Sequence, residues 1–379
     1  MADRNLELGV IGNCAIAALV DPQGTILWSC FPRLDGDPVF CALLRQDGRD
    51  GAFTVEMKET ANTTQRYLDN SAILETLITD SGGNTIEITD YCPRFLRFGR
   101  MFRPPVIMRR IRPVSGRPII TVRIKPLMAN GAVKPEITRG SNHMRFVGPR
   151  NVIRVTTNAP ITYLLEERSF RLGDDLWFVL GPDEAVPEDV RDVGRNQLEA
   201  TLDWWQTWVR GLSIPFEWQE AVIRSAITLK ICNYEETGAI VAALTTSIPE
   251  APNTQRNWDY RYCWIRDSFF VIRVLNALGV TRTMEDYIRF ITDIVDDARD
   301  GGIQPVYSIS RESNLEEVIS ADLNGYRGMG PVRIGNQAYV QKQNDVYGSL
   351  VLACTHVFFD KRLIRQSANP SLFEQLEAI

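Results

Sequence analysis

The pattern of the chain changes at about residue 186, and this change constrains the fold more than any other feature. From residue 6 to about 185, short runs of β-branched and apolar residues alternate with turn signals such as Asp80-Ser81-Gly82-Gly83-Asn84. Many short strands without helices between them favour an antiparallel β-sandwich over residues 1–185. The clearest strand candidates are residues 72–78, 85–89, 118–124 and 152–157.

Beyond residue 186 the apolar residues recur at helical spacing. Leu198, Leu202, Trp205 and Trp208 predict a helix over 188–209, which we interpret as a linker helix within residues 186–214. Residues 215–379 then carry helix after helix, joined by long loops. The predicted helices are 217–236, 266–278, 283–298 and 344–359. The fold class expected is therefore a multidomain α+β protein.

Charge and composition exclude several classes of function. The formal net charge of −5 gives no indication of a basic groove, so we expect no nucleic-acid partner. No apolar run approaches the roughly 20 residues that span a membrane, and the N-terminus lacks the pattern of a secretory signal. We therefore expect no membrane partner. The 7 cysteines are scattered without a CxxC pair, which is typical of buried, reduced thiols in a cytoplasmic protein.

The 2 histidines, His143 and His356, lie far apart in the sequence. A zinc site or a Ser-His-Asp triad is hard to build from them. Acid–base chemistry would then fall to Asp and Glu, and we expect neither a metal nor an organic cofactor.

The densest chemical segment is residues 256–267, here called the aromatic segment. Trp258, Tyr260, Tyr262 and Trp264 recur at every second residue, so an extended backbone would direct all four to one side. Asp259 and Arg261 would then face the other side, and Arg266 and Asp267 come where a helix begins. Aromatic faces pack on the apolar face of a sugar ring, while fixed charged groups bind its hydroxyls. The pattern fits equally well a core strand with a surface ion pair.

The aromatic segment resembles the sugar-binding segment of the family 15 glycoside hydrolases, the glucoamylase and trehalase group. Other motifs resemble this family in the same order along the chain. They are Ile11-Gly12-Asn13-Cys14, Gly24-Thr25-Ile26-Leu27-Trp28, Pro32-Arg33-Leu34-Asp35, Thr245-Thr246-Ser247-Ile248-Pro249-Glu250, Gly325-Tyr326-Arg327-Gly328 and Asp345-Val346-Tyr347-Gly348. Two positions depart from the family: Asn13 replaces its usual Asp, and Ser349 stands where many members have Glu.

The resemblance implies a β-sandwich, a linker helix and an (α/α)6 barrel. It also implies an inverting, exo-acting hydrolase of α-glucosides, with a small-molecule glucoside or oligosaccharide as its partner. Arg266 and Asp267 would bind the hydroxyls of the terminal glucose. The other expected substrate-binding residues are Tyr260, Trp264 and Trp258, with Arg333, Asn336 and Gln341 either facing the pocket or forming a structural loop network.

Inversion requires a general acid and a general base roughly 6.5–9.5 Å apart. In the family the acid lies in a Trp-Glu segment after the Asp345-like helix, and no such segment follows Gly348 here. We therefore expect the barrel to be incomplete (residues 215–379), the acid and base to lie beyond residue 379, and this chain alone to lack activity. Glu235, Glu236, Glu312, Glu316 and Glu317 are expected to be solvated surface charges.

Two alternatives remain beside a hydrolase. A shortened relative could be a non-catalytic carbohydrate-binding or interaction protein, and a glycoside phosphorylase shares the plan of sandwich and helical barrel. An incomplete barrel would expose apolar helix faces, so self-association or mobility near residues 340–379 is a further expectation.

Overall fold

The computed structural model describes residues 5–45, 50–297, 302–363 and 370–378. The chain divides into two units. The first comprises residues 1–209 with 321–331, and the second comprises 210–320 with 332–379. The segment 321–331 therefore departs from the predicted boundary: although it lies within the expected barrel region, it packs with the first unit, where Gly325 N–H donates to the carbonyl of Leu44 over 2.9 Å.

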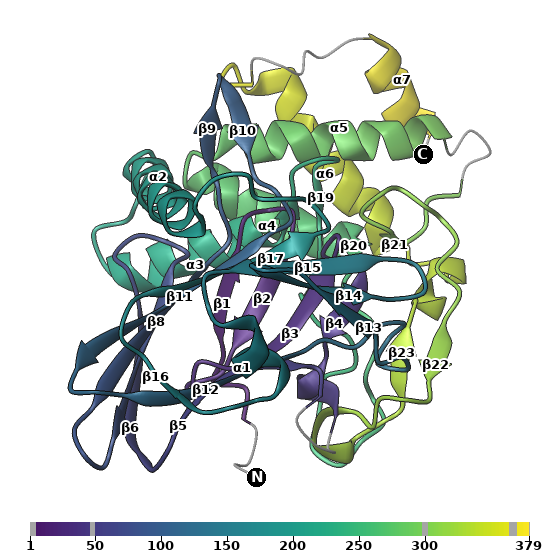
Figure 1. Ribbon diagram of the computed structural model, residues 1–379. Helices are drawn as coiled ribbons and strands as arrows, with labels where there is room; N and C mark the ends of the chain where they lie inside the picture. Colours follow the sequence, from purple (N-terminus) through teal and green to yellow (C-terminus); the bar gives the residue numbers. More distant parts are fainter. Residues whose placement is uncertain (1–4, 46–49, 298–301, 364–369, 379) are drawn as a thin grey trace. The chain divides into compact units, whose positions relative to one another are not determined.

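Two antiparallel sheets form the first unit (Figure 1). One sheet has the order β1-β2-β3-β5-β12-β16, with β4 paired to β3. Its strands are β1 Gly9–Gly12, β2 Ala17–Val20, β3 Ile26–Phe31, β4 Asp37–Phe40, β5 Ala52–Met57, β12 Ile119–Lys125 and β16 Phe170–Arg171. The other sheet has the order β13-β14-β15-β17-β11-β8-β7-β6. Its strands are β6 Thr60–Tyr67, β7 Leu74–Asp80, β8 Thr85–Tyr91, β11 Ile107–Ser115, β13 Glu136–Arg139, β14 His143–Val147, β15 Val152–Thr157 and β17 Leu176–Pro182.

One apolar core lies between the two sheets, as the predicted sandwich requires. Phe53 of β5 contacts Phe178 of β17 edge-on across this core, with ring centroids 5.4 Å apart. Part of the outer face of the eight-stranded sheet is buried as well, because Trp177 and Met108 point away from the core and pack with the helix α2, Val190–Arg210. The predicted linker helix is therefore α2, and it is packed along its length against the sandwich.

The hairpin β9 Phe95–Arg97 and β10 Arg100–Phe102 completes this unit, with the short helix α1 Ile161–Leu165 and the 3-10 turns η1 Ala42–Leu44 and η2 Tyr326–Gly328. Buried Asn13 anchors the hairpin at both ends, since its Nδ2 donates to the carbonyls of Pro93 over 2.9 Å and Pro104 over 2.7 Å.

The second unit is mainly helical. Its helices are α3 Gln219–Ile231, α4 Ile265–Ala277, α5 Thr281–Asp297, α6 Asp345–Phe359 and α7 Pro370–Ala378. Its short strands are β18 Asn233–Tyr234, β19 Ala239–Ile240, β20 Cys263–Trp264, β21 Val306–Tyr307, β22 Val318–Ser320 and β23 Val332–Ile334, and η3 is Gln337–Val340. Helix α4 packs on α5 and α6. The antiparallel β region followed by helices is confirmed, whereas the (α/α)6 barrel stays a prediction.

One predicted helix boundary is wrong. We expected the helix 217–236 to end at Gly238, but α3 ends at Ile231 and the chain forms the hairpin β18–β19. Gly238 lies in its turn at φ +94°, a conformation that favours glycine over residues with a side chain.

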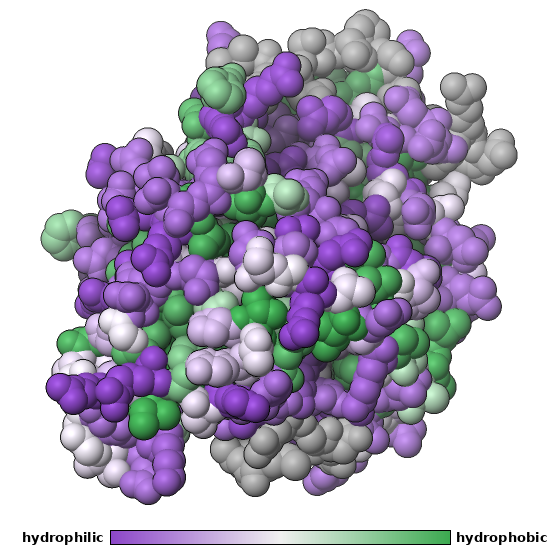
Figure 2. Space-filling model, in the orientation of Figure 1, coloured by the Kyte–Doolittle hydropathy of each residue, from purple (hydrophilic) through white to green (hydrophobic). Residues whose placement is uncertain are grey.

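The face in Figure 2 is predominantly hydrophilic, with apolar residues in small scattered groups. None of the helices in the described ranges combines the length and the apolar character of a membrane span. In the second unit, α4 and α6 expose Phe270, Val274, Leu352 and Phe359. Self-association through these faces stays a prediction.

Candidate functional site

Backbone hydrogen bonds within the second unit hold the aromatic segment in place. The amides of Ala242 and Ala243 donate to the carbonyls of Tyr262 and Tyr260 over 3.0 and 2.9 Å. The amide of Ser247 donates to the carbonyl of Trp258 over 2.8 Å. The segment is thus largely extended, although only Cys263 and Trp264 belong to a named strand, which pairs with β21.

The predicted alternative of a surface ion pair is wrong. Asp259 and Arg261 are both buried, and their side chains pair through contacts of 2.9 Å (Nε–Oδ1) and 2.7 Å (Nη2–Oδ2). Since a bidentate pair satisfies both buried charges, it stabilises the extended conformation on the side of the segment opposite the aromatic rings. Asn336 adds to this support, because its Nδ2 donates to the carbonyl of Asp259 over 2.9 Å.

The opposite side of the segment opens on a pocket of about 300 Å³, here called the aromatic pocket. The rings of Tyr260 and Trp264 lie 6.2 Å apart at 49°, so they present two inclined faces. The lining residues are Trp258, Tyr260, Trp264, Glu317, Asn336, Gln337, Ala338 and Gln341. Five of the eight residues expected to bind substrate therefore line one cavity: Trp258, Tyr260, Trp264, Asn336 and Gln341.

Arg333 is not among the lining residues, but it holds the side chain of one of them in position. Its Nη1 donates to Oε1 of Glu317 over 2.5 Å, and Glu317 lines the pocket. Both the carbonyl and the amide of Arg333 are hydrogen-bonded: Thr246 Oγ1 donates to the carbonyl over 2.5 Å, and the amide donates to Ser247 Oγ over 2.8 Å. The prediction that Glu317 is a solvated surface charge is wrong, because its side chain is 14% exposed.

Arg266 and Asp267 lie at the start of α4, outside the set of lining residues. The guanidinium of Arg266 lies 6.0 Å from the ring centroid of Trp264, so it stands beside the pocket wall. It contacts Asp345 at 3.1 Å and Asp267 at 3.3 Å, and each of the three side chains is more than 40% exposed. The group is thus polar and open to ligands. The assignment of Arg266 and Asp267 to the glucose hydroxyls stays a prediction.

Tyr260, which lines the aromatic pocket, has a raised pKa. Burial raises the pKa of its hydroxyl, and the carboxylate of Glu250 raises it further. The hydroxyl donates to Oε1 of Glu250 over 3.3 Å. Tyr260 therefore stays protonated at neutral pH, with its ring directed to the pocket as an apolar face.

Two other glutamates expected at the surface have defined partners. Glu235 lies 2.5 Å from Nζ of Lys230, and its side chain is 11% exposed, so the expectation is wrong for this residue. Glu236 accepts a hydrogen bond from the hydroxyl of Tyr234 over 2.8 Å. Among the described residues, no group of three or more His, Cys, Asp or Glu side chains is arranged to hold a metal ion.

Comparisons with known proteins agree with this site. Residues 3–166 match the trehalase-like N-terminal domain, and residues 218–375 match the glycosyl hydrolases family 15. The second match includes the aromatic pocket. The chain belongs to the family 15 glycoside hydrolases.

Its curated relatives include trehalases. The chain is 33% identical over 357 residues to a trehalase of Thermoplasma volcanium, covering 91% of this chain and 56% of the relative. It is 31% identical over 367 residues to a trehalase of Mycobacterium tuberculosis, covering 88% and 53%. It is 32% identical over 344 residues to a trehalase of Thermoplasma acidophilum, covering 88% and 58%. The chain thus spans just over half the length of these relatives.

Proposed function

We propose that the chain supplies the glucose-binding part of a trehalase-like α-glucoside hydrolase that inverts configuration and acts on a terminal glucose. The observation that carries the proposal is the convergence of Trp258, Tyr260 and Trp264 with the amides of Gln337 and Gln341 on one pocket. Asn336 supports the wall of this pocket, because its side-chain amide bonds the backbone of Asp259 and Ala338. Aromatic faces that pack on the sugar ring, with amides that both donate and accept, form a binding site for a neutral glucoside.

Arg266 and Asp267 are the proposed contacts to hydroxyls of the terminal glucose. The guanidinium stands beside Trp264 and shares its charge between two exposed carboxylates. A bound sugar can replace the water around these groups and bridge cation and anion with adjacent hydroxyls. Trehalose is the proposed first substrate, since the curated relatives above are named trehalases.

Glu317 has a positioning role in this proposal. Among the described lining residues it is the one carboxylate, and Arg333 holds it. Because its Oε1 is engaged by a guanidinium, we assign it to orienting the sugar rather than to transferring a proton. Inverting hydrolysis needs both an acid and a base on opposite faces of the ring. We propose neither of these groups among the lining residues.

The test combines calorimetric titration of the chain with an assay of glucose release. Trehalose, maltose, glucose and an iminosugar mimic of the glucosyl cation are the probes, with Arg266→Ala beside the unaltered chain. We expect binding of the iminosugar and of trehalose that is lost in Arg266→Ala.

The two readouts separate the candidate functions. Glucose release that disappears in Arg266→Ala supports hydrolysis by this chain, whereas binding without release favours a carbohydrate-binding role for it. Absence of binding by every probe contradicts the proposed sugar site.

A further inference from the structure

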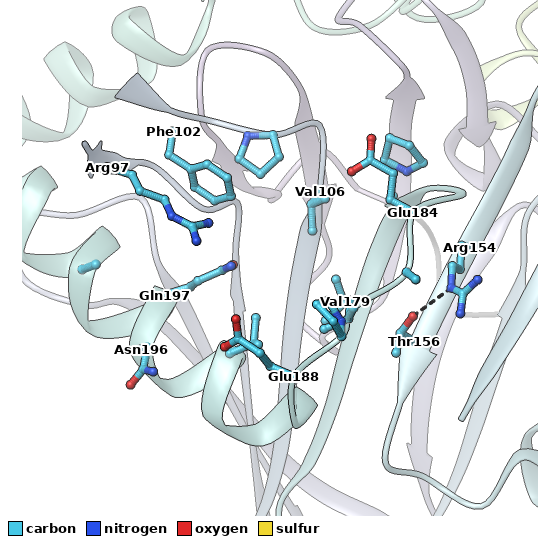
Figure 3. A pocket seen from close by; sticks show the side chains of 18 of the residues that line it. Arg97, Phe102, Val106, Arg154, Thr156, Val179, Glu184, Glu188, Asn196 and Gln197 are labelled. Carbon is cyan, nitrogen blue, oxygen red and sulfur yellow. Dashed lines mark hydrogen bonds between the residues drawn. The ribbon is translucent and has the colours of Figure 1, made fainter. Parts of the chain in front are cut away.

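A second cavity lies in the first unit, on the outer face of the eight-stranded sheet. It has a volume of about 610 Å³, within the range of about 300–1,000 Å³ typical of small-molecule pockets. Its walls are the hairpin β9–β10, the strands β15 and β17, the segment 184–188 and the helix α2 (Figure 3). We call it the sandwich groove.

The walls of the sandwich groove are held by buried contacts outside it. Asn13 binds both ends of the hairpin, and Arg94 donates to the carbonyl of Asn13 over 2.9 Å. Helix α2 is fixed because the hydroxyl of Tyr91 donates to the carbonyl of Gly194 over 2.7 Å. A Cβ at Gly194 would lie 2.2 Å from the ring of Trp177, so α2 sits as close to the sheet as a glycine permits. The groove is therefore preformed.

The interior combines an apolar floor with unengaged polar groups. Val106 and Val179 form the floor, and the rings of Phe95 and Phe102 pack against each other at 4.9 Å on the hairpin side. Five polar side chains around it make no hydrogen bond or ion pair to any residue that the structure describes. They are Arg97, Glu184, Glu188, Asn196 and Gln197. Figure 3 shows Arg97 of the hairpin and Gln197 of α2 with their polar ends directed toward one another.

The charges of the groove balance. The guanidinium of Arg154 is engaged by Thr156 at 3.1 Å and lies 3.6 Å from Asp183. Arg97 packs on the ring of Phe102. It lines the groove together with Glu184 and Glu188, whose carboxylates have no ion-pair partner among the described residues. An anion would meet both carboxylates, and an apolar ligand would strip water from five polar groups without replacing it. A neutral ligand with many hydroxyls suits both the donors and the acceptors.

We propose that the sandwich groove is a second carbohydrate-binding site, which holds a neutral oligosaccharide apart from the aromatic pocket. A sugar ring packs on Phe102, and its hydroxyls bind Asn196, Gln197 and Arg97. The proposal does not depend on hydrolysis at the aromatic pocket, because all residues of the groove belong to the first unit.

The test follows backbone hydrogen exchange of the full chain with and without maltotriose. Ligand in the groove should slow exchange in residues 95–102 and 193–200, which form two of its walls. The double variant Asn196→Ala/Gln197→Ala removes two amide ligands on a helix that tolerates alanine. We expect the affinity measured from this protection to fall at least about tenfold, as expected for loss of two hydrogen bonds.

Glu199→Ala is the matched control, since Glu199 is exposed on α2 and does not line the groove. It should keep the protection of the unaltered chain. Protection confined to residues 256–267 shows sugar in the aromatic pocket alone and overturns the proposal. Three other outcomes also overturn the proposal. They are the absence of any protection in the two walls, protection that persists in the double variant, and protection by sodium sulfate alone. The same protection in Arg266→Ala supports the groove independently of the proposed function.

Discussion

The guanidinium of Arg266 lies 3.1 Å from a carboxylate oxygen of Asp345, which joins the first turn of α4 to the first turn of α6. Both side chains are nearly half exposed, at 44% and 46%. Exposed ion pairs contribute only about 0–1 kcal/mol to stability, so this contact does little to hold the helices together. It presents a cation and two carboxylates beside Trp264, where a ligand can reach them.

This arrangement predicts that Arg266→Ala affects ligands more than folding. The free energy of unfolding should change by less than about 1 kcal/mol, while affinity for trehalose should fall at least about tenfold because a charged hydrogen bond to the sugar is lost. Urea unfolding and calorimetric titration measure the two quantities. Arg273→Ala is the control on the same helix, because Arg273 is exposed and outside the site. Equal loss of affinity in both variants would contradict the assignment.

Unlike breaking the exposed contact of Arg266 with Asp345, breaking the ion pair of Asp90 and Arg109 should strongly reduce stability. Both side chains are fully buried between the sheets, with contacts of 2.6 and 2.8 Å, and Arg109 also donates to the carbonyls of Gly24 and Phe53. Asp90→Asn leaves the guanidinium as an uncompensated buried charge, so stability should fall by about 3–5 kcal/mol. Urea unfolding measures the loss. Asp183→Asn, which removes the partly exposed carboxylate beside Arg145 and Arg154, should cost no more than about 1 kcal/mol.

Asn13 predicts the effect of restoring the residue usual in the family. Its Oδ1 accepts from the amides of Ala15 and Ile16, while its Nδ2 donates to Pro93 and Pro104. Asn13→Asp keeps the acceptor but turns a second acceptor toward two carbonyls. We expect a loss of about 1–3 kcal/mol and faster hydrogen exchange in residues 95–102. Asn62→Asp, at an exposed strand position, should leave both unchanged. A stable hairpin in Asn13→Asp would show that other contacts anchor it.

The cysteines predict a pattern of reactivity. Six of the seven are buried, and Cys232 is the partly exposed one. Burial raises the pKa of Cys263 to about 11 and those of Cys41 and Cys354 to about 12, so these groups remain thiols rather than reactive thiolates at pH 8. A thiol reagent should therefore label one group rapidly in the native protein and all seven after denaturation. Cys232→Ser should abolish the rapid phase, and rapid labelling of two or more native thiols would count against this packing.

Local pattern determined the type of most elements. Leu198, Leu202 and Trp205 recur at helical spacing on one face of α2. Leu198 and Leu202 pack on the sheet, and Trp205 is buried. The alternation in the aromatic segment correctly separated Asp259 and Arg261 from Trp258 and Tyr260. Such features follow from the backbone period of each element, which is a property of neighbouring residues.

Tertiary structure decided which charged groups are buried and which meet at a site. Glu317 directly precedes β22 and Arg333 lies in β23, 16 residues further on. The hydrogen bonds of Thr246 and Ser247 to the backbone of Arg333 help to fix their pairing. Tertiary structure also decides the burial of Arg109. In the sequence it looks like any other arginine of a strand, but its guanidinium lies between the two sheets. A charge can be buried only when distant segments supply its partners, and no local pattern encodes that meeting. The sequence by itself therefore determined the elements and the family resemblance, whereas the partners of Glu317 and Arg109 came from contacts across the fold.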